Sequence, residues 1–117
     1  MAERPTLKQF TEWVNFERRD ELLAADLTGM VMTGAELWGG NLSGLNFRDC
    51  DFAGSNLFGS DMSDADLRGA SLVGADLHRT NLRGAIYDDD TRFPAEFSTE
   101  ERHMVHGRDL PDAESDN

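Results

Sequence analysis

An apolar side chain recurs at every fifth position between residues 20 and 89, and this period constrains the fold more than any other feature of the chain. It holds at all 14 positions: Leu22, Leu27, Met32, Leu37, Leu42, Phe47, Phe52, Leu57, Met62, Leu67, Leu72, Leu77, Leu82 and Tyr87. Side chains return to one face after 3.6 residues in a helix and after 2 in a strand, so neither element explains the pattern. The segment is therefore an internal repeat.

The positions around each apolar residue are restricted too. The preceding residue is Asp, Glu or Asn in 11 units, the residue two later is Gly in nine, and the residue two earlier is mostly small. A chain that turns one corner per repeat keeps every fifth side chain inward, and glycine permits the corner backbone. Four corners close a square coil, and such coils stack by backbone hydrogen bonds at roughly 4.7–4.9 Å. Three- or six-sided coils satisfy the same inward rule, so the period leaves the number of sides open.

The units resemble those of a known family. Ala65-Asp66-Leu67-Arg68-Gly69 is similar to the Ala-(Asp/Asn)-Leu-X-X unit of pentapeptide repeat proteins, and the exit through Phe93-Pro94 resembles the way their repeats end. The resemblance implies an all-β solenoid, a right-handed quadrilateral β-helix with four repeats per coil and here about 3.5 coils. The central positions predict a core that includes Leu37, Phe47, Phe52, Leu57, Leu67 and Leu77.

The period divides the chain into a capping segment 1–19, the repeats 20–89, a C-terminal cap 90–107 and a tail 108–117. Near the N-terminus, Thr6 and Gln9 have the spacing of a capping box, and an apolar stripe follows. This pattern predicts a helix over 7–18 that covers the open edge of the first coil. Binding of a partner or a membrane by the stripe is the alternative.

At the other end, Ser98 to Glu101 has the spacing of a second capping box. It predicts a short helix to about His106, with Gly107 as its stop. Phe93 and Phe97 are placed to close the last coil. The acidic residues 108–117 predict a disordered tail.

Composition limits the partners. The formal charge of −12 argues against direct nucleic-acid binding, which needs a basic face, and favours a basic protein partner. Cys50 is the one cysteine and falls at an inward position, which predicts a buried, inert thiol and suits a reducing compartment. There is no apolar run of the length of a signal peptide or a membrane span, so we expect no membrane association and a cytoplasmic protein.

No catalytic motif is evident, so we expect neither an enzyme nor a cofactor. The glycines are corner residues rather than a phosphate-binding loop, and carboxylates on a convex rod lack a pocket. The triplet Asp88-Asp89-Asp90 lacks the spaced ligands of a calcium loop and is interpreted as a solvated loop. His103 and His106 raise the alternative of a metal site, but no further ligand accompanies them, so we expect no metal.

In a square coil, residues 20 apart stack in columns and define two candidate binding surfaces. The first is an acidic face of Glu21, Asp26, Glu36, Asp51, Asp61, Asp64, Asp66 and Asp76. Acid and Asn alternate in most of its columns, which relieves charge repulsion and makes acidity alone a poor guide to function. The second is an aromatic strip of Trp38, Phe58 and His78, with Thr33, Ala53 and Val73 beside it. Such a strip marks a partner or dimer contact, unless a terminal segment covers it.

The resemblance also implies a function. Some pentapeptide repeat proteins are similar to B-DNA in width and charge and inhibit type II topoisomerases, and such a rod would equally obstruct a defence nuclease complex. A stack of about 17 Å matches only about five base pairs, so DNA mimicry here requires a homodimer. The competing hypothesis is a protein-interaction module that uses the aromatic strip without mimicry. A stable scaffold without a dedicated partner is the third.

Overall fold

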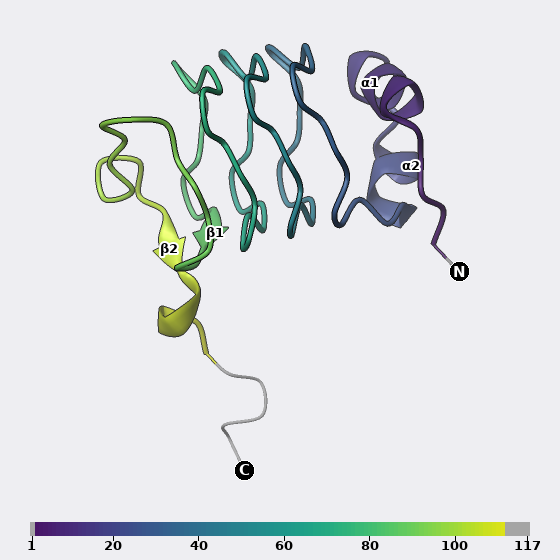
Figure 1. The fold of residues 1–117 in the computed structure, drawn as a ribbon. Coiled ribbons are helices and arrows are strands. Elements are labelled where there is room, and N and C mark those ends of the chain that lie inside the picture. Colours follow the sequence, from purple (N-terminus) through teal and green to yellow (C-terminus); the bar gives the residue numbers. More distant parts are fainter. Residues whose placement is uncertain (1, 112–117) are drawn as a thin grey trace.

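The computed structural model describes residues 2–111, and a stack of coils occupies most of this length (Figure 1). Isolated parallel bridges join residues of successive coils, for example Val31 to Asp51 and Glu36 to Asn56. Further bridges run from Asn41 to Asp61 and on to Asn81. The offset is 20 residues, or four five-residue units, so each coil has four sides. The three-sided and six-sided alternatives are excluded.

One tight turn per repeat forms each corner. The N–H of Ala35 donates to the carbonyl of Met32 at 3.1 Å, and Gly34 between them has φ 68°. A positive φ at the third residue of a turn is what a type II turn requires, which explains the glycine at this position. Asp49 and Asp64 take the same conformation with φ 62° and 59°. The backbone period therefore continues through units that lack glycine.

The central residues fill a narrow core along the axis. Leu37, Phe47, Phe52, Leu57, Leu67 and Leu77 are all at most 4% exposed. Cys50 is buried among them, and its thiol donates to the carbonyl of Leu27 at 2.9 Å. Burial raises the pKa of the Cys50 thiol to about 11, so it stays protonated and unreactive.

Two buried hydroxyls of this core should respond oppositely to alanine. Ser60 Oγ donates to the carbonyl of Leu57 at 2.8 Å, whereas Ser55 Oγ is buried without a partner among the described residues. We expect Ser60→Ala to lower the free energy of unfolding by about 0.5–1.5 kcal/mol and Ser55→Ala to leave it unchanged or raise it slightly. Urea denaturation of the two variants measures the difference. Equal losses would contradict the assignment of Ser55 as unsatisfied.

Helix α1, Leu7–Asn15, covers the first coil (Figure 1). Its capping box is present: Thr6 Oγ1 accepts from the N–H of Gln9 at 3.1 Å, and Gln9 Oε1 accepts from the N–H of Thr6 at 3.0 Å. Phe10 and Val14 are its buried residues. The helix is shorter than the predicted 7–18, because Phe16 is its C-cap and Glu17 takes a φ of 55°.

Residues 20–24, predicted as the first repeat of the β-helix, are helical in the structure. They belong to helix α2, Arg19–Ala24, which carries Asp20 and Glu21 in its first turn, where carboxylates favour a helix. Leu22 is buried all the same, at 2% exposure. The guanidinium of Arg19 donates to the carbonyls of Asn41 and Ser43 and so ties the helix to the solenoid.

The predicted helix near 98–106 is also wrong. Ser98 Oγ accepts from the N–H of Glu101 at 3.2 Å, but the chain then extends into strand β2, Val105–His106. Strand β2 pairs in parallel with β1, Ile86–Tyr87, and continues one side of the stack (Figure 1). Gly107 opens the 3-10 helix η1, Gly107–Asp109, instead of stopping a helix. Most of the predicted acidic tail, 112–117, lies outside the described residues.

The aromatic residues after the repeats pack on the last coil. The rings of Phe93 and Phe97 stack with centroids 4.8 Å apart, and Phe93 meets Tyr87 edge-on at 5.7 Å. Both phenylalanines contact the buried core. They close part of the C-terminal end, as their apolar character predicts.

Candidate interaction surfaces

The Asp and Asn residues that precede the core positions cap the turns. Asp61 Oδ1 accepts from the N–H of Ser63 at 3.0 Å, and Asp76 Oδ1 accepts from the N–H of His78 at 3.0 Å. The same contact occurs at Asp26, Asn41, Asn46, Asp51, Asn56, Asp66 and Asn81. Bonding to the backbone two residues on is a property of these short side chains. Much of the acidity therefore follows from turn chemistry.

The eight acids predicted to form one face lie on different sides. The bridges place Asp51 with Val31 and Ser71, Asp61 with Asn41 and Asn81, Asp66 with Asn46 and Ile86, and Glu36 with Asn56 and Asp76. Glu21 lies on α2 and pairs with Arg18, and Asp26 pairs with Arg4 at 2.8 Å. Asp64 is a corner residue whose carboxylate lies against Gly84. The acids thus surround the stack instead of forming one continuous face.

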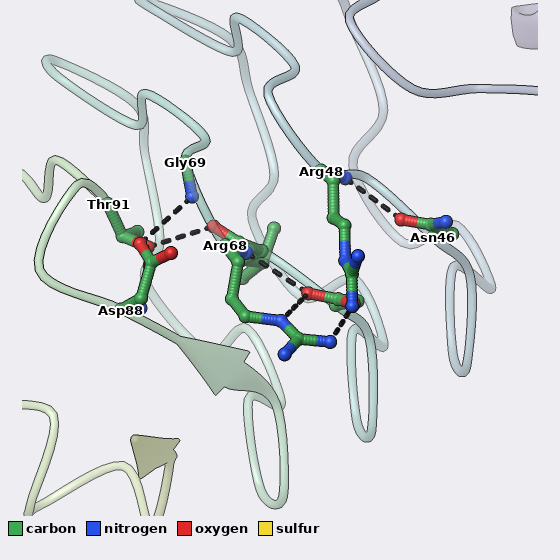
Figure 2. A network of polar contacts seen from close by, with 8 residues as sticks. Asn46, Arg48, Arg68, Gly69, Asp88 and Thr91 are labelled. Atoms are coloured by element: carbon green, nitrogen blue, oxygen red, sulfur yellow. Dashed lines mark hydrogen bonds and ion pairs between the residues drawn. The ribbon is translucent and has the colours of Figure 1, made fainter. Parts of the chain in front are cut away.

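Two arginines neutralise one of these carboxylates. Arg48 Nε donates to Asp66 Oδ2 at 2.7 Å, and Arg68 donates to both oxygens of Asp66 at 3.0 and 2.8 Å. Figure 2 shows the two guanidinium groups converging on this side of the stack. Partial burial opposes ionisation of Asp66, but the arginine hydrogen bonds outweigh it and lower its pKa. The charge of Asp66 is therefore compensated locally and is not free to meet a partner.

Asp88 extends the same cluster. Its Oδ1 accepts from the N–H of Gly69 at 3.1 Å and from the hydroxyl of Thr91 at 3.2 Å (Figure 2). Burial opposes ionisation, yet the backbone N–H groups of Gly69 and Asp90 lower the pKa of Asp88. The first residue of the Asp triplet therefore holds the chain exit to the coil below it.

These lowered pKa values predict acid destabilisation. For a carboxyl group whose pKa is lower in the folded state, the stabilisation is complete above its unfolded value of about 3.9 and is lost as the pH falls through the folded value. We expect the free energy of unfolding, measured in urea, to be lower at pH 3 than at pH 7. Asp66→Asn should be less stable than the parent at pH 7 and should lose less on acidification. An equal loss in both proteins would exclude Asp66 as a contributor.

The aromatic strip of Trp38, Phe58 and His78 is exposed. Trp38 is 67% and Phe58 43% exposed, and the neighbouring Val73 is 51% exposed. The ladder holds their backbones in register: the N–H of Gly39 donates to the carbonyl of Phe58 at 2.9 Å, and the next coil repeats this contact to His78 at 3.0 Å. Within residues 2–111, neither terminal segment covers Trp38 or Phe58. The described residues therefore do not provide the intramolecular cover that the alternative required at these two side chains.

A hollow of about 210 Å³ lies at one end of the strip and was not anticipated. Its lining includes Ala75, Leu77 and His78 from the last coil and Phe97 and Arg102 from the segment after the repeats. The sequence signal for it was the loss of the five-residue period after Tyr87. In the structure, a bridge continues the stack from Ser71 to Arg92, whereas Asp76 is bridged back to Asn56 but to no later residue among those described. One side of the last coil is thus left without a strand above it.

His103 and His106 do not meet at a metal site. His106 Nε2 contacts Asp89 Oδ1 at 2.8 Å, and its Nδ1 accepts from the N–H of Arg108 at 3.1 Å, so both ring nitrogens are engaged. Within 2–111, no three His, Cys, Asp or Glu side chains gather as metal ligands. Neither described α-helix has the length and apolarity to cross a bilayer.

The comparisons with known proteins agree with this geometry. The family model described as pentapeptide repeats matches residues 22–49 and 46–84 in 8 copies. The chain belongs to the pentapeptide repeat family. Proteins of this family form right-handed quadrilateral β-helices and are generally non-catalytic structural or interaction proteins. No curated protein matches the chain.

Solved pentapeptide repeat proteins provide the structural comparison. Rfr23 from the cyanobacterium Cyanothece 51142 is 31% identical with a TM-score of 0.58, over 60% of this chain and 48% of its own. The chain thus spans about half the length of that protein. Alr5209 from Nostoc Pcc 7120 is 27% identical with a TM-score of 0.34, over 91% of this chain and 99% of its own. A protein of the Arabidopsis thaliana thylakoid lumen is 22% identical with a TM-score of 0.32, over 78% of this chain and 70% of its own.

Proposed function

We propose that this pentapeptide repeat protein is a non-catalytic, cytoplasmic protein-binding module whose partner docks on the aromatic strip. The observation that carries the proposal is the exposure of Trp38 and Phe58 on adjacent coils of a hydrogen-bonded ladder. Aromatic side chains of this kind dominate binding energy at protein interfaces. Their backbones are already ordered, so binding costs little conformational entropy.

The surroundings of the strip favour a partner with basic residues beside an apolar surface. Glu36 and Asp76 lie in the neighbouring column, and Asp76 Oδ1 contacts His78 Nδ1 at 2.8 Å. The hydrogen bond from the N–H of His78 and the contact with its ring lower the pKa of Asp76, so this carboxylate is charged at neutral pH. The strip therefore offers aromatic rings next to negative charge, which suits arginine or lysine.

A second candidate is a DNA-mimic inhibitor of a nucleic-acid-handling enzyme, such as a type II topoisomerase or a defence nuclease complex. It is favoured by the charge of −12 and by acids that make no ion pair with another described residue, among them Glu36, Asp51, Asp61 and Asp64. The short stack means that this role requires a homodimer. The distribution of acids over several sides favours the module instead.

Pull-down from the protein's own cell extract, at low and high salt, tests the two functions. For the module, we expect salt-tolerant capture that falls about tenfold or more in Trp38→Ala or Phe58→Ala. Phe16→Ala is the matched control, because Phe16 is 74% exposed on the capping segment. For mimicry, capture falls steeply with salt, competes with duplex DNA and is lost in Asp61→Lys/Asp64→Lys. Capture unaffected by Trp38→Ala and Phe58→Ala would overturn the module.

A further inference from the structure

The side of the last coil that contains residues 75–79 has an unpaired backbone edge. One coil below, the N–H of Leu57 donates to the carbonyl of Asp76 at 3.0 Å, and the N–H of Gly59 donates to that of His78 at 3.0 Å. The corresponding N–H groups of Leu77 and Arg79 have no acceptor among the described residues. Unpaired edges of this kind are templates for another strand.

Each of the other three sides of the coil is joined to the chain beyond Tyr87 by at least one backbone hydrogen bond or bridge. Ile86 of β1 pairs with Val105 of β2, and the N–H of Leu72 donates to the carbonyl of Arg92 at 2.7 Å. The N–H of Gly84 likewise donates to the carbonyl of His103 at 2.9 Å. Between Arg92 and His103 the chain passes around the hollow without pairing to residues 75–79. The gap in the ladder and the hollow therefore coincide.

The ladder defines what would fill this gap. In the lower coils, Asp51 shows the pattern. Its carbonyl accepts from the N–H of the core residue Met32 at 2.7 Å, and its own N–H donates to the carbonyl of Met30 at 2.9 Å. The residue two later, Ala53, accepts from Gly34 at 3.0 Å. Transferred to the last coil, a parallel three-residue strand would donate to the carbonyl of Ala75 and accept from Leu77 and Arg79. Its middle side chain would face the hollow between Leu77 and Phe97.

The charges around the hollow select the sequence of that strand. Glu96 and Glu101 line it. Arg102, the one arginine in the lining, already donates to the carbonyl of Thr80 at 3.1 Å and lies 5.1 Å over the ring of Phe97. His78 is held by Asp76. Arg102 keeps its charge in these contacts, but the two lining carboxylates outnumber the one guanidinium, so the net charge at the hollow is negative and complements a lysine or arginine.

We infer that residues 75–79 bind an extended segment of a partner protein, in which an aliphatic residue is flanked by basic ones, as an added parallel strand. Main-chain hydrogen bonds supply affinity, and the hollow and its glutamates supply specificity, as in other cases of strand addition. The site is distinct from the Trp38 and Phe58 surface and shares only His78 with it. It stands whether or not the proposed function is correct.

Two measurements on the full chain test the site: amide hydrogen exchange by NMR, and binding of the fluorescein-labelled peptide Lys-Thr-Ile-Thr-Lys. In the free protein, the amides of Leu77 and Arg79 should exchange faster than those of Leu57 and Gly59, and the peptide should slow them. Methylation of the first threonine nitrogen removes the donor to Ala75 and should weaken binding about tenfold. Glu96→Lys/Glu101→Lys should do the same, whereas Glu100→Lys, outside the lining, and Trp38→Ala should not.

Three results would overturn the inference. Leu77 could be as protected as Leu57 in the free protein at every concentration, which would mean that the chain fills its own edge. Protection that rises with protein concentration alone would assign the edge to a second copy. Binding that is indifferent to nitrogen methylation would show that no strand is added.

Discussion

Phe47→Ala should lower the free energy of unfolding by about 3–5 kcal/mol, the usual range for removal of a buried phenylalanine. Phe47 is fully buried and lies between two other rings, with centroid distances of 6.1 Å to Phe10 and 5.1 Å to Phe52. Phe10 belongs to α1, whereas Phe52 belongs to the solenoid. The substitution therefore removes both core volume and a link between the capping helix and the coils.

Urea denaturation followed by circular dichroism measures this loss, with Phe16→Ala as the control. Phe16 is 74% exposed, and its truncation should change stability by less than about 0.5 kcal/mol. Each coil contacts only its neighbours, so the loss should appear first as local opening near α1. Hydrogen exchange should then be faster around Leu27 and Met32 than around Leu72. A loss below about 1 kcal/mol would contradict the central position of Phe47 in the core.

The five-residue period predicted the fold because it is a constraint on every unit at once. Each inward position must be apolar, and each corner must take a positive φ. The coil continues even where the corner residue is not glycine, as at Arg79, which has φ 58°. The number of sides was open, because any corner geometry returns every fifth residue inward. The 20-residue bridges settle it, since they depend on how coils pair and not on one unit.

The ends were predicted less well because tertiary pairing overrides local signals there. Leu22 continues the five-residue series, but one apolar residue can be buried from a helix as well as from a coil. Asp20 and Glu21 favour the start of a helix here. At the other end, Ser98 accepts the hydrogen bond typical of a helix N-cap, but no helix follows. Instead, Val105 pairs with Ile86 and extends the backbone ladder. The backbone edge of the last coil attracts a strand, and local helix propensity is too weak to compete.

The binding surfaces divide in the same way. The columns that place Trp38 beside Phe58 follow from the period, so the aromatic strip was predictable. The use of Asp61 and Asp76 as turn caps was signalled by the preference for Asp and Asn over Glu, but their charge suggested a partner instead. The hollow was not predictable, because Phe97 reaches it through an irregular segment with no period.

Gly40→Ala should lower the free energy of unfolding by about 1–3 kcal/mol, the range for overpacking a tight contact. A Cβ at Gly40 would lie 2.5 Å from Val14 Cγ1 and 3.1 Å from the carbonyl oxygen of Leu37. Val14 is 5% exposed and β-branched, so it has little freedom to move aside. Gly40 is thus a position of close contact between α1 and the solenoid backbone.

A double-mutant cycle with Val14→Ala separates this clash from a general effect of the substitution. Val14→Ala removes the Cγ1 methyl that the new Cβ would meet, so Gly40→Ala should be tolerated much better in that background. The two substitutions should therefore be non-additive, with the double variant more stable than the sum of the single losses predicts. Fluorescence of Trp13, isolated in a Trp38→Phe background, reports whether α1 stays docked. Additive losses would show that the destabilisation does not come from the contact with Val14, and would contradict the close contact between α1 and the first coil.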